Sequence, residues 1–452
     1  MSGRAATSAR ERSAARRARR SAPAVAVTAA IGVATSAGAV VGPLVGRAAA
    51  VEAVPGSAPV GPAGGDVDLA APPDEPGARR YVSLRHPVRV YAPPRVAATE
   101  ALAALAAADR VWDVVTGALS LPAPDGGLDG TWDVYLVDHV AGGGDALVEE
   151  RDPRARFDRA VTFAVVERSI APGCGLDLAL ARALARAVLA RFAPATDRGS
   201  ARAQSEALAR LVVPCADPGA DTLEFQAHPE RAIVDPSSGE FDRGASVFFS
   251  WLDARFARQP GSLVAGLWAL APTRTPPDAQ RWSATPTGFD VLRESLKGAF
   301  GPGPTLDELF AGFSVERTTL EPGPRLAWQV PWPSQARRLA SPEPVWPTGA
   351  SYVVVDHAGA PPGAKLRLEA QWEDYGRMRW AVVKLDAAGR AMAVLTVTSL
   401  DRGTRTSMTV ESLDDVARVA IVGTNVGSTE HAFDPHQGEW EPHGWLLTIA
   451  PE

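Results

Sequence analysis

The stretch LDLALARALARAVLARF, residues Leu176–Phe192, decides how the first half of the chain is interpreted. Leucine or valine recurs at every fourth position from Leu180 to Val188, which predicts an amphipathic helix with one apolar stripe. Arg182 and Arg186 share another face of this helix, and Pro194 forces the helix to end. The residues alone therefore indicate a helix buried on one side.

Strand and helix patterns surround this helix in a definite order. Strands are expected at residues 81–92, 132–138 and 160–167, because these runs are β-branched and aromatic. Helices are expected at residues 96–119, 176–192, 200–213, 245–257, 261–270, 288–299 and 305–315. The glycines of residues 141–146 are expected to form a flexible loop, and the carboxylates of residues 148–152 a solvated turn. Strands followed by helices predict an α+β domain over residues 79–320.

The last part of the chain has the pattern of an all-β domain. Residues 321–350 contain seven prolines and three tryptophans, so we expect a linker without regular structure that lies extended against one or both domains. Seven short strands follow in residues 351–452, and alternation within Leu366–Trp372 predicts one wet and one dry face. Residues 386–390, with Gly389 available for a positive φ, predict a hairpin turn. We expect an immunoglobulin-like β-sandwich.

The first 53 residues have the features of an export signal. Seven arginines occur in residues 1–20, and residues 21–46 then carry no charged side chain. This pattern and small-residue sites at 48–50 and 51–53 are typical of a secretory signal peptide, and paired arginines permit a twin-arginine signal. We expect export to the periplasm, cell surface or extracellular space. A retained N-terminal anchor and no export are the alternatives.

Composition and cysteine content are consistent with export. Residues 54–78 are rich in Pro, Gly and Ala, which predicts a disordered spacer. Without residues 1–53 the chain has 38 basic and 50 acidic residues, which gives no reason to expect a nucleic-acid partner.

Cys174 and Cys215 flank a pair of expected helices, and an oxidising compartment favours a disulfide between them. Two separate buried thiols are the alternative.

The order of elements from about residue 131 to 320 resembles that of secreted bacterial zinc metallopeptidases of the gluzincin type. The resemblance rests on SEALA, which contains Glu206, on VFFSWLDARFARQPG at 247–261 and on TLDELFAGFSVER at 305–317, with SYVVV and VARVAIVGTNVG in the following sandwich. It implies a zincin-like, mostly helical domain. It also implies an H-E-x-x-H motif on the helix at 176–192 and a glutamate ligand on the next helix.

Carried over to this sequence, the resemblance implies a degenerate site. Arg182 and Arg186 stand where the histidine ligands would be, Ala183 where the general base would be, and Glu206 at the remaining ligand position. A charged guanidinium has no lone pair for zinc, and alanine cannot accept a proton from water. We therefore predict no catalytic residue, no metal and no cofactor. Glu206 is expected either to pair with one of these arginines or to be a solvated helix residue.

Other candidates for chemistry are weaker. His86, His139, His228 and His357 are isolated in the sequence and are expected to be structural or surface residues. Residues 431–443 contain three histidines and three acidic residues, which predicts an exposed hairpin loop or, alternatively, a divalent-cation site. No G-x-S-x-G, P-loop or C-x-x-C motif is found.

Three functions remain open. The first is an exported, non-catalytic metallopeptidase-like protein that binds a peptide or an envelope partner. The second is a structural or adhesive surface protein that works through its β-sandwich. The third is a hydrolase whose active site uses residues outside known motifs.

Overall fold

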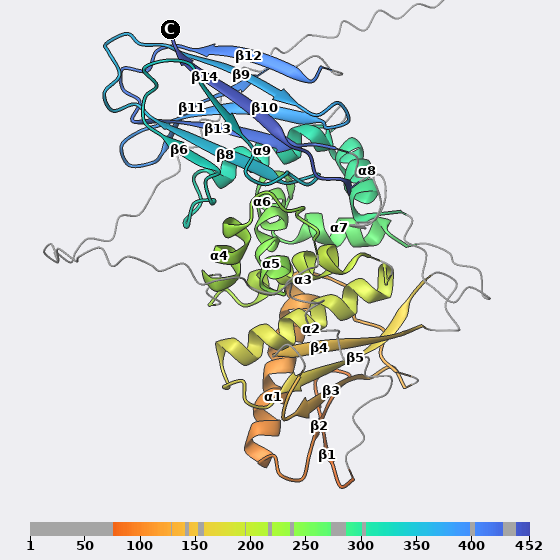
Figure 1. Cartoon of the computed structure of the whole chain (residues 1–452). Helices are drawn as coiled ribbons and strands as arrows, with labels where there is room; N and C mark the ends of the chain where they lie inside the picture. The colour runs from red at the N-terminus through yellow and green to blue at the C-terminus, as the bar shows by residue number, and fades with distance from the viewer. Residues whose placement is uncertain are drawn as a thin grey trace, which may run out of the picture. The chain divides into compact units, whose positions relative to one another are not determined.

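The computed structural model describes most of the chain after residue 75. The described residues are 76–127, 129–140, 144–151, 158–194, 196–215, 219–235, 239–272, 286–300, 304–397, 403–427 and 440–452. The expected signal peptide of residues 1–53, and the spacer up to residue 75, lie outside them. The described chain is α+β, with a mixed sheet and helices followed by a β-rich region of two sheets (Figure 1).

The first sheet has the strand order β1-β2-β3-β5-β4. Its strands are β1 (Arg79–Val82), β2 (Val88–Ala92), β3 (Trp132–Val137), β4 (Asp145–Arg151) and β5 (Ala160–Glu167). The central strands β2, β3 and β5 are parallel, whereas β1 and β4 are antiparallel edge strands. The central positions are buried valines and alanines, as expected for strands covered on both faces.

Two expectations for this region are wrong, and a third, the first helix, is present with a π-helical last part. The single strand expected at 81–92 is a hairpin, because the Ser83 hydroxyl accepts the backbone N–H groups of Arg85 and His86 and turns the chain. The helix expected at 96–119 is α1 (Ala98–Trp112) followed by a π-helical segment (Asp113–Ala118). Of the turn expected at 148–152, residues 148–151 instead belong to β4, whose backbone pairs with β5 from Asp145 to Arg151, and residue 152 lies outside the described residues.

Eight further helices are described between this sheet and the β-rich region. They are α2 (Cys174–Phe192), α3 (Arg198–Val212), α4 (Gly219–Ala227), α5 (Gly239–Gly244), α6 (Ser246–Phe256), α7 (Ser262–Leu270), α8 (Gly288–Phe300) and α9 (Leu306–Arg317). The sequence pattern predicted all of them except α4 and α5. A large core joins the helices to the sheet, with α2 packed between β4 and β5 on one side and α3 on the other.

The β-rich region consists of two sheets that share one core. One sheet has the order β11-β10-β13-β8-β6 and the other β12-β9-β14-β7. The strands are β6 (Trp328–Val330), β7 (Arg337–Ala340), β8 (Ala350–Asp356), β9 (Leu366–Trp372), β10 (Met378–Leu385), β11 (Ala391–Val397), β12 (Arg405–Val410), β13 (Arg418–Asn425) and β14 (Trp445–Pro451). Buried side chains of both sheets face each other, so the expected sandwich is present at this coarse level.

The expectation that residues 321–350 have no regular structure is wrong, because this segment takes part in the sandwich. It contains β6, which pairs with β8, and β7, which pairs with β14. Both are edge strands, where a chain rich in proline can still form part of a sheet. The expected hairpin turn is confirmed, since Gly389 has φ +81° between β10 and β11.

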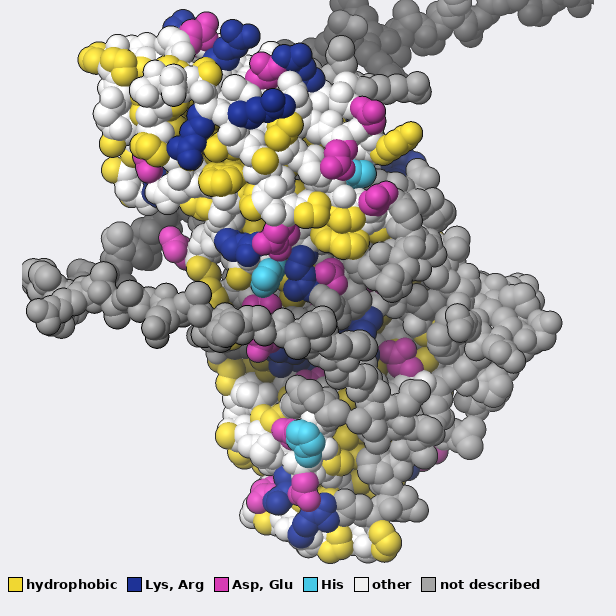
Figure 2. All heavy atoms as spheres, in the orientation of Figure 1, with side chains coloured by type: hydrophobic (Ala, Val, Ile, Leu, Met, Phe, Trp, Pro, Cys, Tyr) yellow, Lys and Arg dark blue, Asp and Glu magenta, His cyan; other side chains and the backbone are white. Residues whose placement is uncertain are grey.

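Helix α9 covers the outer face of the five-stranded sheet. Val315 packs against a cluster that includes Tyr352 and Val422. The Tyr352 hydroxyl donates a 2.8 Å hydrogen bond to the Ser314 carbonyl, and burial raises the pKa of this tyrosine to about 12. Where Figure 2 shows the side chains of described residues, basic and acidic groups are interspersed.

Candidate functional site

The candidate site lies where α2 meets α3 and β4. Arg182 and Arg186 are one helical turn apart on α2, and Leu180 and Leu184 of the same helix are fully buried. The two arginines are only partly exposed, at 21% and 23% of their side-chain surface. Long charged side chains in such a position need partners.

Glu206 on α3 is the central acceptor of the site. Its carboxylate is 1% exposed and binds both the Nε and the Nη2 of Arg182, with 3.1 Å between Nη2 and Oε1. The Nε of Arg210 donates a second bond of 2.6 Å to the same Oε1. The ion pair between Glu206 and an arginine of α2 is therefore present, in the bidentate geometry that gives the strongest arginine–carboxylate contacts.

Further charges surround this pair. Asp221 on α4 accepts from Arg210 at 3.0 Å and from Arg243 of α5 at 3.1 Å. Arg186 does not contact Glu206; its Nη2 lies 3.8 Å from Glu149 of β4. The group thus connects α2, α3, α4, α5 and β4. We call it the arginine cluster: Arg182, Arg186, Arg210, Arg243, Asp145, Glu149, Glu206 and Asp221.

The pKa values of the carboxyl groups in the cluster reflect burial and the charges of the neighbouring arginines. Burial by itself raises the pKa of Glu206, but the hydrogen bonds and charges of Arg182 and Arg210 outweigh it, so the pKa is lowered. Burial raises the pKa of Asp145 although Arg182 and Arg186 oppose this rise. Burial also raises the pKa of Glu149. The Glu206 carboxylate is therefore charged and engaged, whereas the carboxyl groups on β4 are more readily protonated.

Zinc does not fit the residues at this position. The metal takes imidazole, thiolate or carboxylate ligands, and two of the expected ligand positions carry guanidinium groups. The third expected ligand position, Glu206, is already hydrogen-bonded to two arginines. Within the described ranges, no group of three or more His, Cys, Asp or Glu side chains is arranged to hold a metal ion. That these positions are relics of a metal site stays a prediction.

The expected disulfide is confirmed. Cys174 and Cys215 are bonded, with their Cα atoms 6.1 Å apart. The bond connects the first residue of α2 to the segment just after α3, and so it fixes the helix pair that carries Arg182 and Glu206. A disulfide is typical of proteins in an oxidising compartment outside the cytoplasm. In the part of the chain that the structure describes, no helix is both long and apolar enough to cross a membrane.

The isolated histidines have separate local partners. The contacts are His86 with Asp113 at 2.8 Å, His139 with Glu167 at 2.9 Å, His228 with Glu230 at 3.3 Å, and His357 against the ring of Trp332 at 5.1 Å. Of the histidine-rich loop at 431–443, residues up to 439 lie outside the described residues. His443 contacts Glu373 at 3.1 Å, and the cation site in this loop stays untested.

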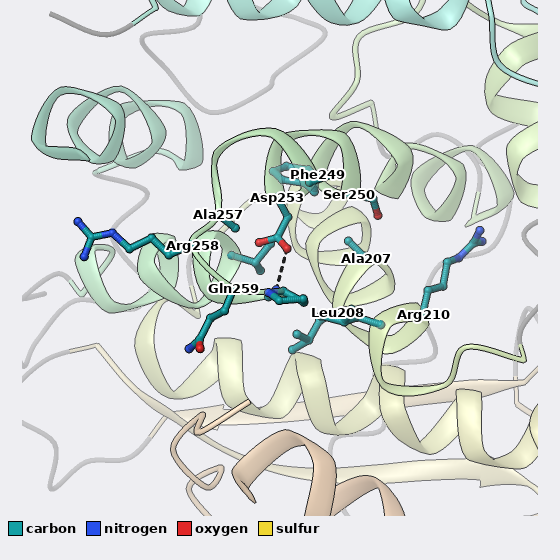
Figure 3. A pocket seen from close by; sticks show the side chains of 14 residues that line it. Ala207, Leu208, Arg210, Phe249, Ser250, Asp253, Ala257, Arg258 and Gln259 are labelled. Carbon is teal, nitrogen blue, oxygen red and sulfur yellow. Dashed lines mark hydrogen bonds between the residues drawn. The ribbon is translucent and has the colours of Figure 1, made fainter. Parts of the chain in front are cut away.

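A pocket opens on the opposite side of α3, between α3, α6 and the turn into α7 (Figure 3). Its volume is about 500 Å³. Arg210 lines this pocket and also belongs to the arginine cluster, so it is the residue common to both sites. In Figure 3 the Asp253 carboxylate points toward the loop, where it accepts the N–H of Gly261 at 2.7 Å.

Fold and site together define an α+β protein with a disulfide-linked helix pair, an ion-paired junction and a two-sheet β region. No model of a known protein family matches the sequence, and no curated protein matches it. Two of the solved structures similar to part of the chain are the pre-peptidase C-terminal domain of collagenase from Bacillus anthracis and tailspike protein 4 of bacteriophage CBA120. The first has 7% identity and a TM-score of 0.19, and the match covers 28% of this chain and 96% of that one. The second has 10% identity and a TM-score of 0.17, and the match covers 26% and 19%.

Proposed function

We propose that this chain is an exported, non-catalytic protein of the zincin-like type, followed by an immunoglobulin-like sandwich, and that it acts by binding. The observation that supports the proposal most directly is the bidentate pair between Arg182 and Glu206. In the register that the resemblance to gluzincins implies, this pair stands at the metal position, where Glu206 is already bonded to two arginines. Binding without cleavage is the function that such a junction permits.

The ligand that fits best is an extended peptide segment of an envelope or secreted partner. β4 is an edge strand of the first sheet, so its outer backbone groups are not paired with another described strand. Extended peptides bind such edges by adding a strand. Asp145 and Glu149 on β4 lie beside Arg182 and Arg186 of α2, so both signs of charge are available to select the peptide.

Metal content and proteolysis test the non-catalytic part of the proposal. We expect the purified chain to contain no stoichiometric zinc by mass spectrometry and to leave casein uncleaved. Zinc at one equivalent together with chelator-sensitive cleavage would overturn the proposal. Cleavage that a chelator does not affect would favour the hydrolase with a non-motif active site.

A designed metal site tests the assigned register. The triple variant Arg182→His, Ala183→Glu and Arg186→His places a zinc-binding motif opposite Glu206. We expect this variant to bind one zinc ion, and the same variant with Glu206→Gln to bind it at least about tenfold more weakly because one ligand is lost. A folded triple variant that binds no zinc would contradict the equivalence of these positions.

The alternative is a structural or adhesive protein that works through its sandwich. The observation that favours it is β11, an edge strand on which Met392 and Val394 are each 49% exposed. Photo-crosslinking residues placed at Glu149 and, separately, at Met392 distinguish the two binding modes in intact cells. Crosslinks to a partner from position 149 support peptide binding at β4, whereas crosslinks from position 392 alone support the adhesive function.

A further inference from the structure

The pocket beside α3 has the size and lining of a small-molecule site. Its volume of about 500 Å³ lies in the range of about 300–1,000 Å³ that is typical of ligand pockets. The interior consists mainly of apolar side chains, among them Leu208, Phe249 and Val264, each less than 5% exposed. This surface favours an apolar group that is removed from water.

Two of the three charged side chains that line the pocket already have partners. Asp253 is satisfied by the backbone N–H groups of Gly261 and Leu263, at 2.7 and 3.1 Å. Arg210 is committed to Glu206 and Asp221 on the far side of α3.

Arg258 is the remaining charged residue of the pocket lining. Its side chain is exposed and extends outward at the edge of the pocket (Figure 3), and it has no ion-pair or hydrogen-bond partner within the described ranges. Gln259 and Ser250 are the neutral polar groups of the same rim. One unpaired cation therefore stands beside an apolar interior.

We infer that this pocket binds a small amphipathic carboxylic acid, with its hydrocarbon part between α3 and α6 and its carboxylate at Arg258. A hydrocarbon chain matches the apolar walls, and a single negative charge matches the single uncommitted arginine. The opposite end of such a ligand needs no polar partner, because the lining residues other than Arg258, Gln259 and Ser250 are apolar or glycine, apart from the committed Arg210 and Asp253. This inference goes beyond the proposed function, since it concerns the other side of α3.

Chain-length dependence and a neutral analogue define the ligand class. We expect calorimetric titration with hexanoate, octanoate and decanoate to show affinity rising about fourfold per methylene group, the value for burying one such group. Decanol, which has the same chain without the charge, should bind about fivefold more weakly than decanoate because an exposed ion pair contributes little. Failure of the chain to bind decanoate, or affinity that does not change with chain length, would overturn the inference.

Matched variants locate the site. Arg258→Gln should weaken decanoate about fivefold and leave decanol unchanged. Arg255→Gln is the control, because Arg255 is an exposed arginine nearby that lies against the rings of Trp251 and Phe256 and does not line the pocket. Equal effects of the two substitutions would overturn the assignment of the carboxylate to Arg258.

Filling the pocket provides an independent test. Ala254 lines the pocket and is exposed on α6, so Ala254→Trp adds an indole without entering the core. It should weaken both decanoate and decanol at least tenfold, while circular dichroism and the urea midpoint stay unchanged. If that variant does not fold, Leu211→Gln tests the same wall at a position that is 39% exposed. Binding that survives the filling of the pocket would contradict the inference.

Discussion

Neutralising Glu206 is the sharpest test of the arginine cluster. Glu206→Gln keeps the size of the side chain and one oxygen acceptor, but removes the negative charge between Arg182 and Arg210. The side chain is 1% exposed, whereas the arginines are 21% and 15% exposed. Water therefore cannot replace the lost carboxylate, and two guanidinium groups remain close together without the anion that separates them.

The expected loss of stability follows from this geometry. Two unit charges 4 Å apart interact by about 4 kcal/mol at an effective dielectric constant of about 20, and Glu206 has two such partners. Desolvation of the three groups offsets much of this gain. Removing one partner of a buried pair typically costs about 3–5 kcal/mol, so we expect about 3–5 kcal/mol for Glu206→Ala and about 2–3 kcal/mol for Glu206→Gln, which keeps a hydrogen bond.

Urea unfolding followed by tryptophan fluorescence measures this loss. Glu224→Gln is the matched control, because Glu224 is 32% exposed and its ion pair among the described residues is with His228, at 3.6 Å. This substitution should change stability by less than about 1 kcal/mol. Because the pKa of Glu206 is lowered by folding, its contribution is complete above the ordinary glutamate pKa of about 4.3 and disappears as the pH falls through the folded-state value. A Glu206→Gln variant as stable as the control at pH 7, or a difference that grows in acid, would refute this reasoning.

Three further predictions concern the parts that hold the site in place. Replacing Cys174 and Cys215 together by serine should cost about 4 kcal/mol, the loop-closure value for a separation of 41 residues; wild type in reductant should unfold like this variant, and an unchanged urea midpoint would contradict the estimate. Arg317→Met should cost about 2–4 kcal/mol in urea unfolding, because this fully buried guanidinium donates two 2.8 Å bonds to acceptors on α4. An unchanged stability would mean that water satisfies these acceptors in the variant and would contradict the prediction. Thr305→Ala should cost about 1 kcal/mol by removing the capping box of α9, measured as a lower melting temperature.

Elements with a clear hydrophobic period could be predicted from the sequence. The apolar stripe of Leu176–Phe192 specifies α2, and the alternation of Leu366–Trp372 specifies β9 with its buried and exposed faces. β4 could not be predicted in this way, because its acidic residues are those of a solvated turn. Edge strands carry charged residues without cost, since one side of their backbone faces solvent. The strand conformation of β4 comes from its pairing with β5, and the residues of β4 alone do not reveal this pairing.

The arginine cluster could be predicted only in part for the same reason. The contact between Arg182 and Glu206 follows from the register of two neighbouring helices. Arg210 had a local signal that the sequence analysis missed, since it stands four residues after Glu206 on one helix, a spacing that brings side chains together. Asp221 and Arg243 have no such signal. They reach the site because α4 and α5 pack beside α3, and no periodic pattern predicted these short helices.

The charge balance of the cluster determines how a metal could be introduced there. Four guanidinium groups meet four carboxyl groups, and burial raises the pKa of two of these, Asp145 and Glu149, so the site carries no net negative charge as it stands. The triple variant Arg182→His, Ala183→Glu and Arg186→His removes two positive charges from partly buried positions and adds one negative charge at Ala183, which is 0% exposed. Without metal, this variant should be at least about 3 kcal/mol less stable than wild type, because Glu206 loses its bidentate partner and a carboxyl group is buried at position 183. Zinc supplies two positive charges and binds only the folded state, so it should restore stability in proportion to the logarithm of its concentration. A metal-free triple variant as stable as wild type would show that the arginines of α2 do not hold this junction together.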